Sequence, residues 1–574
     1  MAEHPASSMT PWQELKTDAA ACRWLRWHPS QLASCVAERG DFLPEPLGAD
    51  ELRELREAHA KWGADPASLA AIDLLGSPRT RVVIAGQQPG FLAGPLLIVY
   101  KAMAAVKLAR RLAEQNPGLD FAPVFWVASE DHDFNEIRRA YWPGQSGLEE
   151  AYIQPSLWEA GQMIGLVETE SVIGGLVGQI EQTTFRSEYR DTIIKLLREA
   201  YGAADATVES GFCRLLLKLL AGTGLVVVSP LMNWVRRRGA AIMTRELEQA
   251  GRSTVAVIAR AVEMGAAGME PPVHRAPTAI NGFWVDGQGR RWALHRGEDG
   301  RVRRVLGETR EELEPVAVGE LLGALAADAA RVSPNVVTRA IVQDAILPTV
   351  AQVVGPGEAA YLAQIEPAYE NFGVFAPVRW PRPELTLIEQ RVARSLEKYE
   401  IELGEALCKD PEPLMERFLR GEMEHGALSR IETLRARQRG EIEELYGGIG
   451  LDVPAIRAAF DKLAQAMDKG YKAIEERVLQ QRAEDEAHVR RGLAIVSASL
   501  RPAGLAQERA LNPIIPFAVN YGLDWVGRLF DKIDITPTRP LQVVALAELV
   551  KGETHARRFE PDQAEGDLQR LEQG

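Results

Sequence analysis

Four short apolar runs, separated by stretches of helical periodicity, constrain the fold of this chain more than any other feature. The runs are Arg81–Ala85, Phe121–Ala128, Gly224–Pro230 and Thr349–Val354. Between the first two, apolar residues recur at steps of three and four over Gly94–Gln115. Strands that are apolar on both faces are typical of a parallel sheet covered by helices on both sides. The pattern therefore predicts an α/β protein with a doubly wound parallel sheet as its core.

Changes of pattern divide the chain into five expected segments. These are an N-terminal helical segment, a core with insertions, a helical arm, a segment that returns to the core and a polar tail, at residues 1–75, 76–383, 384–503, 504–550 and 551–574. Within the core we expect a helical insertion at about 150–220 and a second insertion at about 232–310. The second adds an antiparallel meander to its helices, because Gly/Asp turns at hairpin spacing separate three short strands within 278–306.

The strand signal vanishes for more than a hundred residues after the core, and long helical stripes replace it. Apolar residues step by three or four over Ile456–Val478, and a comparable stripe runs through Leu428–Tyr446. Asp452 and Pro454 form a helix start signal. The pattern predicts two antiparallel helices joined by Gly447–Gly450, a coiled-coil hairpin. Such a hairpin either packs on the core or serves as a dimerisation arm, because its second apolar edge needs a partner.

Composition and charge limit the class of protein. The 574 residues include 66 Lys+Arg and 80 Asp+Glu, a net charge of −14, which disfavours a dedicated nucleic-acid binder. The four cysteines form no Cys-x-x-Cys pair, which argues against a disulfide scaffold and a structural zinc site. The first residues lack the pattern of a signal peptide, and no stretch of about 18 apolar residues occurs. We expect a cytoplasmic protein without a membrane span.

The first candidate binding motif lies between the strand at 81–85 and the following helix. It comprises Gly86, Gln87, Gln88, Pro89 and Gly90. A Gly-rich strand-to-helix turn exposes backbone N–H groups and the positive end of the helix dipole, which favours an anion. The motif is neither a Walker A loop nor a G-x-G-x-x-G fingerprint, and a turn that only packs is the alternative. Two glutamines at the carboxyl end of a buried strand favour ligand binding.

The second candidate motif follows the strand at 121–128 directly. It comprises Ser129, Glu130, Asp131, His132 and Asp133. Carboxylates that flank an imidazole can supply a general base, a cation site or both. The alternative is a solvated turn that caps the next helix. No second His/Asp cluster with ligand spacing supports a metal, so we predict none.

The third candidate motif surrounds the fourth apolar run. Its polar and glycine residues are Ser333, Asn335, Arg339, Gln343, Asp344, Gly355, Gly357 and Glu358. On a helix, Arg339 and Gln343 are four residues apart and share a face. The two glycines allow a backbone to approach a ligand closely, although a strand–helix turn would use them equally well.

A fourth polar cluster follows the long helices. It comprises Gln507, Arg509, Asn512 and Tyr521. Two interpretations remain open for it, namely a second ligand site and a contact that docks the arm to the core.

Together and in this order, these motifs resemble the cysteine ligases of bacillithiol biosynthesis, the BshC family. The similar strings are VIAGQQPGFLAGP, PVFWVASEDHDFNEI, SPNVVTRAIVQDAILPTVAQVVGPGEAAYLAQIEPAYENFG and QERALN…NYG, and they span about residues 80 to 525. The resemblance implies a Rossmann-like core similar to class I nucleotidyl transferases, with connecting-peptide insertions, a coiled-coil hairpin and a homodimer. It also implies an activity, the joining of L-cysteine to glucosaminyl-malate through an amide bond.

A ligation of this kind requires an activated carboxylate, and we expect ATP or another nucleotide to activate cysteine as an adenylate. The loop Gly86–Gly90 and Lys101 would stabilise phosphate charge. The amine would be kept deprotonated by Asp131, His132 or Asp133. The malate carboxylates or the cysteine amine would be held by Asn335, Arg339 and Glu358.

The chain departs from the family pattern at two positions. Ala93 stands where a Thr is usual, and Tyr100 stands where a His is usual before Lys101. If that His assists a leaving phosphate, its role here is unfilled or is taken by His132. A degenerate, non-catalytic nucleotide-binding scaffold with a dimerisation arm is therefore the alternative function. A tRNA-charging enzyme is disfavoured by the acidic charge and by the absence of the signatures H-I-G-H and K-M-S-K-S.

Overall fold

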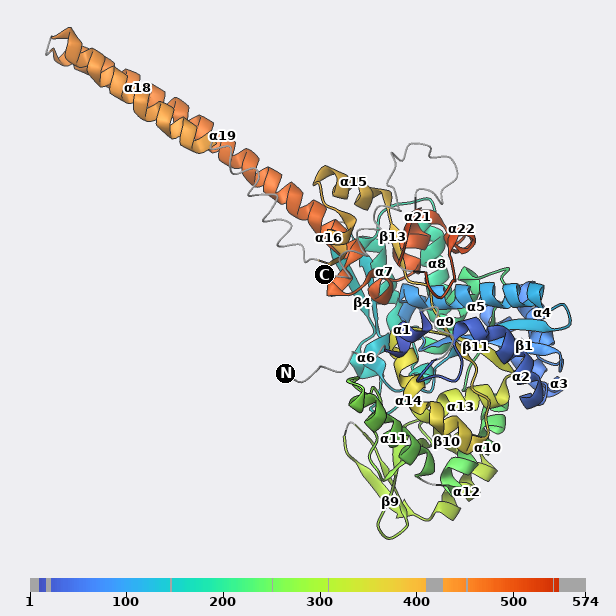
Figure 1. Cartoon of the computed structure of the whole chain (residues 1–574). Coiled ribbons are helices and arrows are strands. Elements are labelled where there is room, and N and C mark those ends of the chain that lie inside the picture. Colours follow the sequence, from blue (N-terminus) through green and yellow to red (C-terminus); the bar gives the residue numbers. More distant parts are fainter. Residues whose placement is uncertain are drawn as a thin grey trace, which may run out of the picture. The chain divides into compact units, whose positions relative to one another are not determined.

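The computed structural model describes residues 10–16, 22–144, 147–249, 251–307, 309–408, 427–450, 453–539 and 541–546. They form two compact units (Figure 1). The first comprises the described residues up to Trp142, then Glu149–Ile388 and those from Gln507 onward. The second comprises Pro143–Leu148 and Glu389–Ala506. The predicted polar tail and the predicted helix-start residue Asp452 lie outside the described residues.

A five-stranded parallel sheet forms the centre of the first unit. Its strands are β1 (Thr80–Gln87), β2 (Asp120–Val127), β5 (Val226–Val228), β11 (Thr349–Val354) and β12 (Val378–Pro381). They are ordered β12-β11-β1-β2-β5, so the first strand lies in the middle and the chain winds to both sides of it. The predicted doubly wound α/β core is confirmed, and β12 extends it beyond the four strands expected from apolar runs.

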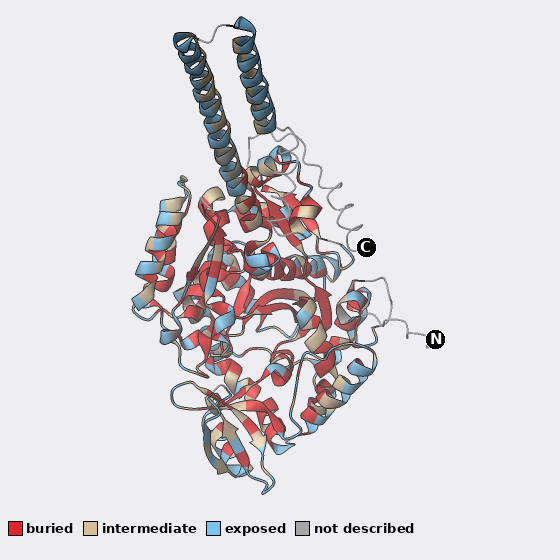
Figure 2. Ribbon diagram, turned by 90° about the vertical axis from the view of Figure 1, so that its left-hand side faces the viewer, coloured by how far each residue is buried: buried red, intermediate tan, exposed pale blue. Residues whose placement is uncertain are grey.

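Helices bury the strands of this sheet, which are coloured as buried in Figure 2. Val82 and Ile84 of β1 pack in one core with Leu55 and Ile72, which come from α3 (Ala49–Trp62) and α4 (Pro66–Leu74). The long helix α5 (Leu96–Gln115) packs against β1 and β2. Burial by helices explains why the strands read as continuous apolar runs and not as alternating ones.

Further helices of the first unit lie within the predicted N-terminal segment and within the two predicted insertions. The N-terminal segment contains α1 (Pro11–Leu15) and α2 (Leu32–Glu38) before α3 and α4. The insertion after β2 contains α7 (Glu170–Thr183), α8 (Arg190–Tyr201) and α9 (Val208–Leu219). The second insertion begins with α10 (Asn233–Glu248) and α11 (Arg252–Ala266).

An antiparallel sheet follows these helices, as the hairpin turns predicted. The three expected strands are β6 (Ala279–Val285), β7 (Arg291–Arg296) and β8 (Val302–Val305). Two further strands, β9 (Glu312–Val316) and β10 (Val332–Pro334), extend the sheet to the order β10-β6-β7-β8-β9. The third motif therefore begins on a strand, where Ser333 pairs with Phe283.

The expectation that strands end with the core is wrong at one place. Strand β13 (Leu385–Ile388) pairs in parallel with β14 (Gln542–Ala545), far along the chain. Four residues give too short a pattern to separate a strand from the start of a helix, and the partner that stabilises this strand is distant in sequence.

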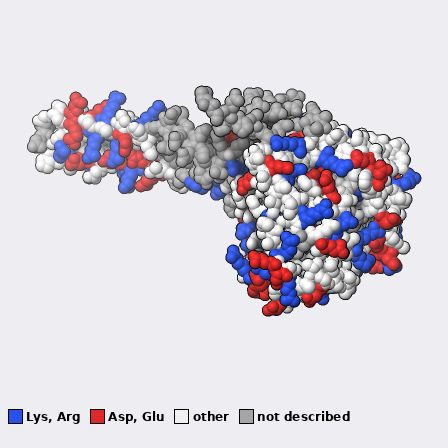
Figure 3. Space-filling model, turned by 60° about the horizontal axis from the view of Figure 1, so that its bottom comes forward, with Lys and Arg blue, Asp and Glu red and all other residues white. Residues whose placement is uncertain are grey.

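The second unit contains the predicted coiled-coil hairpin. Among its described residues are the helices α15 (Gln390–Lys398), α16 (Leu403–Cys408), α18 (Ala427–Ile449) and α19 (Pro454–Leu500). The rings of Tyr446 and Phe460 meet edge to face between α18 and α19, and Arg435 pairs with Asp468 at 2.9 Å. Charges of both signs alternate along the hairpin (Figure 3). Helix α18 continues to Ile449, so the connection between the two helices begins later than the predicted Gly447–Gly450 loop.

Several large apolar side chains on the two hairpin helices are exposed. They include Leu434, Leu445, Leu463, Ile474 and Leu479, each between 47% and 61% exposed. Exposed apolar side chains on both helices agree with the expectation that the hairpin keeps apolar surface beyond its own helix contact. Within the described residues, no helix is long and apolar enough to cross a membrane.

Candidate active site

A cleft of about 470 Å³ opens where β1 and β2 end. It is bounded by the loops after these strands, by the antiparallel sheet and by the N-termini of α13 (Val336–Ile346) and α14 (Pro356–Phe372). The predicted site residues that line it are Gly86, Gln87, Gln88, Glu130, Asp131, His132, Asn335, Arg339, Gly357 and Glu358. Three motifs that are far apart in sequence therefore meet at the sheet edge where open α/β folds bind ligands.

Two helix N-termini border this cleft. Asn335 caps α13, and its Oδ1 accepts hydrogen bonds from the backbone N–H groups of Val337 and Thr338 at 2.9 and 3.3 Å. Gly357 and Glu358 belong to the first turn of α14. The positive ends of both dipoles favour an anion here. The first turn of α5 does not line the cleft, and its first amide, Leu96 N–H, donates to Leu511 O at 2.9 Å.

Asp131 joins the first two motifs. Its Oδ2 accepts from Gln88 Nε2 at 2.6 Å, and its Oδ1 accepts from the backbone N–H groups of His132 and Asp133 at 2.7 and 3.2 Å. Burial opposes its ionisation, but the Arg291 charge and these hydrogen bonds together hold the pKa of Asp131 below its usual value. An ionised carboxylate with a lowered pKa and three donors is a weak general base.

Glu130, the preceding residue, has the opposite character. It lines the cleft and is only 7% exposed. Burial raises its pKa to about 7, although the charges of Arg291 and Arg236 oppose the rise. A carboxyl group whose pKa lies near neutrality can exchange a proton at physiological pH, as a general base requires.

Arg291 connects the second and third motifs and belongs to none of the motifs predicted from sequence. Its Nε donates to Ser333 Oγ at 3.1 Å, its Nη1 to His132 Nδ1 at 3.2 Å, and its Nη2 to Pro334 O. The guanidinium lies over the Phe283 ring, 4.0 Å from its centroid. A charged residue at the start of a short β-strand carries no local signal of burial, and only the sheet brings Arg291 to the cleft.

The cleft is rich in guanidinium groups. Arg275, Arg291 and Arg339 all line it. Arg339 Nη2 donates to Tyr361 Oη at 2.5 Å, and Tyr361 is a further lining residue that sequence analysis did not single out. Burial alone would lower the pKa of Arg339, but Tyr361 and Glu358 outweigh it and raise it. Three arginines and two helix N-termini together suit a ligand with several negative charges.

Lys101 lies behind the cleft and does not line it. Its ammonium group is 1% exposed and donates to Gly86 O at 2.7 Å, to Gln87 Oε1 at 2.9 Å and to the Glu358 carboxylate. Burial lowers its pKa, and Glu358 opposes that effect. Because all three N–H donors are used within the protein, Lys101 holds the end of β1 against α14 and has no free donor for a phosphate.

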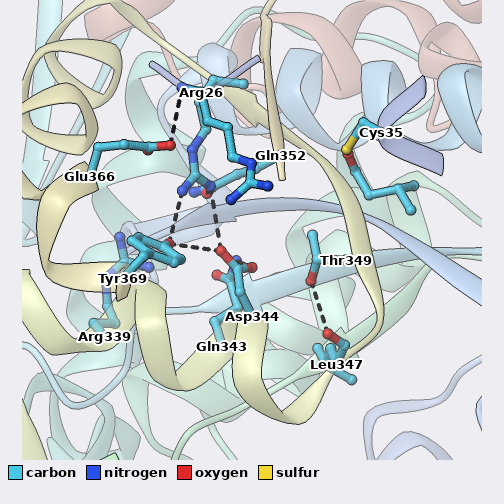
Figure 4. Close-up of polar contacts among 12 residues, drawn as sticks. Arg26, Cys35, Arg339, Gln343, Asp344, Leu347, Thr349, Gln352, Glu366 and Tyr369 are labelled. Carbon is cyan, nitrogen blue, oxygen red and sulfur yellow. Dashed lines mark hydrogen bonds and ion pairs between the residues drawn. The ribbon is translucent and has the colours of Figure 1, made fainter. Parts of the chain in front are cut away.

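Two residues of the third motif lie in a separate buried network. Asp344 accepts from Tyr369 Oη at 2.8 Å and from Gln343 Nε2 at 3.0 Å, and it lies 3.5 Å from Arg379 (Figure 4). Asp344 and Gln343 are fully buried, so they fasten α13 to α14 and β12 and do not reach the cleft. Gln343 shares a helical face with Arg339, as predicted, but that face continues from the cleft into the core, so Gln343 does not reach the cleft.

The other predicted residues have positions beside the cleft or further away. Asp133 occupies the N-cap position of the short helix α6 (Phe134–Ile137) without a side-chain capping hydrogen bond, and Ser333 contacts the cleft residue Arg291. The residues that do not line the cleft are Pro89, Gly90, Asp133, Ser333 and Gly355. Glu136, which does line it, lies just beyond the predicted second motif.

The C-terminal polar cluster anchors backbone within the first unit. Gln507 forms two hydrogen bonds with the backbone of Leu387, at 2.8 and 2.9 Å. Asn512 Nδ2 donates to Leu92 O at 2.9 Å, in the turn that follows the first motif. Arg509 is exposed, and Tyr521 contributes its carbonyl to Arg528. None of the four lines the cleft. Their contacts support an anchoring role and not a second ligand site.

No group of three or more His, Cys, Asp or Glu side chains is placed to hold a metal ion among the residues that the structure describes.

Comparison with known proteins identifies the family. Residues 48–383 match the family described as bacillithiol biosynthesis BshC, N-terminal Rossmann-like domain. Residues 385–539 match its C-terminal coiled-coil domain. The chain belongs to the BshC family. The resemblance expected from the motifs is thereby confirmed.

Individual relatives of the BshC family agree over most of their length. The protein of Chlorobaculum tepidum is 29% identical over 83% of this chain and 84% of its own, and that of Salinibacter ruber 29% over 84% and 86%. The protein of Symbiobacterium thermophilum is 31% identical over 82% and 85%. All three are named "Putative cysteine ligase BshC". A solved structure of an arginyl-tRNA synthetase-like protein from Campylobacter jejuni aligns at 10% identity over 75% of this chain and 94% of its own, with a TM-score of 0.24, too low to support any argument.

Proposed function

We propose that this BshC protein joins L-cysteine to glucosaminyl-malate through an amide bond in bacillithiol biosynthesis. The observation that carries the proposal is the convergence in one cleft of the three motifs by which the chain resembles its family. The names of its relatives support a ligase over the alternative of a non-catalytic scaffold.

The positive side of the cleft suits anionic substrates. The malyl group carries two carboxylates, and Arg275, Arg291 and Arg339 supply guanidinium groups that bind carboxylates with paired donors. A nucleotide such as ATP fits the same chemistry, because its phosphates would lie near the N-termini of α13 and α14 and beside Gly86 and Gly357. Such a nucleotide would supply the activation that a carboxylate needs before an amine can displace one of its oxygens.

Glu130 is the residue to which we assign the general base. The attacking glucosamine amine must lose a proton, and a carboxylate with a pKa of about 7 can accept it near neutral pH. Asp131 is less suited, since its pKa is lowered and its oxygens already accept three hydrogen bonds. Asp133 does not line the cleft.

The two departures from the family pattern lie outside the cleft. Ala93 and Tyr100 are fully buried and do not line it. Tyr100 therefore does not fill the role expected of the usual histidine, whereas His132 does lie in the cleft and is available to a substrate.

Product formation tests the proposal. Purified protein should convert ATP, L-cysteine and glucosaminyl-malate into bacillithiol, detected by mass spectrometry after thiol labelling, and reactions without each substrate should give none. A BshC relative run in parallel is the control for assay conditions. If the relative forms product and this folded protein does not, the proposed ligase activity is wrong. Nucleotide binding by calorimetry without cysteine-dependent turnover would favour the scaffold instead.

We also propose that the protein is a homodimer formed through its hairpin. The exposed side chains of Leu434, Leu445, Leu463, Ile474 and Leu479 provide apolar surface that a second copy would cover. A cytoplasmic location fits the proposed ligase activity, because the cysteine substrate must stay reduced.

A further inference from the structure

The hydrogen bond between Arg291 and His132 determines where the imidazole carries its proton. Arg291 Nη1 lies 3.2 Å from His132 Nδ1. A guanidinium group can only donate, so Nδ1 must accept through its lone pair. A neutral imidazole with an unprotonated Nδ1 carries its proton on Nε2.

Arg291 is itself held so that this hydrogen bond persists. It is buried, its Nε and Nη2 donate to Ser333 Oγ and Pro334 O, and its plane lies over the Phe283 ring. The His132 ring meets the same Phe283 ring edge to face, with centroids 5.3 Å apart. Two side chains packed on one aromatic ring keep their mutual orientation, because neither can rotate without losing this contact.

The surroundings also keep His132 uncharged. Burial and then the adjacent Arg291 charge lower its pKa to about 4, against the opposing carboxylates of Asp131 and Asp133. Asp131 Oδ1 lies 4.0 Å from His132 Nδ1, and it already accepts two backbone N–H groups. The imidazole is therefore neutral throughout the physiological pH range.

We propose that Arg291 locks His132 in the neutral Nε2–H tautomer, so that His132 acts in the cleft as a hydrogen-bond donor and not as a general base. This inference rests on the ligase function proposed above. The Nε2–H group would donate to an anionic oxygen of the substrate, a carboxylate or phosphate oxygen, where a neutral donor stabilises charge as it develops. Arg291 is the positioning residue for this donor.

The tautomer can be observed without any assay of activity. In protein labelled with ¹⁵N-histidine, His132 is one of nine histidines and is assigned by its absence in His132→Gln. Its Nε2 should show a directly bound proton and its Nδ1 none, unchanged from pH 7.5 to pH 5.5. A protonated Nδ1, or a titration within that range, would overturn the inference. This result stands whether or not the ligase proposal holds.

Replacing the positioning residue provides a second readout. Arg291→Gln removes the obligate donor and its charge, so the pKa of His132 should rise and its proton should distribute over both nitrogens. Arg290→Gln is the matched control, because Arg290 pairs with Asp286 and not with His132. An Nε2–H signal in Arg291→Gln identical to that of the unsubstituted protein would contradict the positioning role.

Kinetics separate a donor from a base. Glutamine places an N–H group near the position of Nε2 but cannot accept a proton at neutral pH. If His132 donates, His132→Gln should keep kcat within about 10-fold of the unsubstituted enzyme, whereas His132→Ala should lose on the order of 100-fold, as removal of one donor to a developing charge does. Equal losses in both variants would identify a base and refute the inference.

Discussion

At the scale of single residues, neighbouring side chains of the same type differ in what they can do. Glu130 and Asp131 are adjacent carboxylates, yet burial raises the pKa of the first while donors and Arg291 lower that of the second. The sequence identified the run of ionisable groups but could not distinguish the two, because the deciding partners Gln88 and Arg291 come from other strands. The tertiary contacts of the two carboxyl groups therefore decide which of them can accept a proton near neutral pH.

The raised pKa of Glu130 predicts how stability depends on pH. Between its ordinary value of 4.5 and about 7, the folded state holds a proton that the unfolded state has released. The contribution of Glu130 to the free energy of unfolding is therefore fully present below pH 4.5 and is lost as the pH rises through 7. Relative to Glu130→Gln, the unsubstituted protein should lose about 3 kcal/mol of unfolding free energy over that window.

Urea unfolding of both proteins at several pH values between 4.5 and 8 measures this difference. Glu298→Gln is the matched control, because Glu298 is exposed in the turn after β7 and its replacement removes no buried carboxyl group. A Glu130→Gln protein whose relative stability did not change with pH would show that Glu130 ionises as an ordinary carboxyl group.

The buried pair of Lys101 and Glu358 predicts a second effect on stability. Lys101→Met leaves the Glu358 carboxylate without its counter-ion beside the cleft, and breaking a buried pair in this way costs about 3 kcal/mol. Adding Glu358→Gln should restore part of the loss, because the uncompensated charge is gone. The readout is the urea midpoint of each variant.

A surface lysine provides the comparison for Lys101. Lys195 pairs with Glu199 at 3.7 Å and is 77% exposed, so Lys195→Met should cost less than about 1 kcal/mol. If Lys101→Met were as mild as Lys195→Met, the ammonium group would not be fastening β1 to α14.

At the scale of elements, sequence pattern found long or strongly apolar segments and missed short ones. The four apolar runs correspond to β1, β2, β5 and β11, and the stripes correspond to α18 and α19. Strands β9, β10, β12 and β13 have three to five residues each, too few to show a period, and their partners decide their conformation. Arg291 was not predicted as a site residue although its strand β7 was, because its role depends on contacts with residues of other elements.

The shape of the turn after β1 depends on Asn512. The Asn512 Nδ2 group donates to Leu92 O, and the Asn512 Oδ1 atom accepts from the backbone N–H groups of Ile514 and Ile515 at 2.8 and 3.0 Å. Leu92 and Ala93 have positive φ values of 55° and 60°, a conformation that needs support from its surroundings. Asn512→Ala leaves these buried groups unpaired and should cost about 2 to 3 kcal/mol.

Thermal unfolding of Asn512→Ala measures that cost. Arg509→Ala is the control, because Arg509 is exposed in the same segment and its removal should change stability by less than about 0.5 kcal/mol. A loss of substrate affinity in Asn512→Ala with unchanged stability would instead support the second ligand site that the sequence suggested.

At the scale of the whole molecule, the order of the motifs carried more information than any motif alone. Gln88, Asp131, Arg291 and Arg339 are separated by up to about 250 residues, and the parallel sheet with its inserted antiparallel sheet brings them to one cleft. Each motif on its own was compatible with an ordinary turn. Resemblance over most of the chain predicted that they act together, whereas side-chain roles such as the anchoring by Gln507 and Asn512 required the contacts themselves.

The proposed dimer predicts a consequence for the whole molecule that leaves each chain folded. Leu445 and Leu463 are 61% and 48% exposed on the hairpin, so their replacement removes little buried surface within one chain. Leu445→Glu combined with Leu463→Glu places charges on the proposed contact, where two copies would bring like charges together in a desolvated interface.

The unsubstituted protein should sediment as a dimer at micromolar concentration and the double variant as a monomer, with equal helix content by circular dichroism. Glu441→Gln with Asp461→Asn alters exposed polar positions of the same two helices and should remain dimeric. A monomeric unsubstituted protein would contradict the proposed dimer. A dimeric double variant would exclude Leu445 and Leu463 from the dimer contact, because a buried apolar seam does not tolerate two unpaired carboxylates.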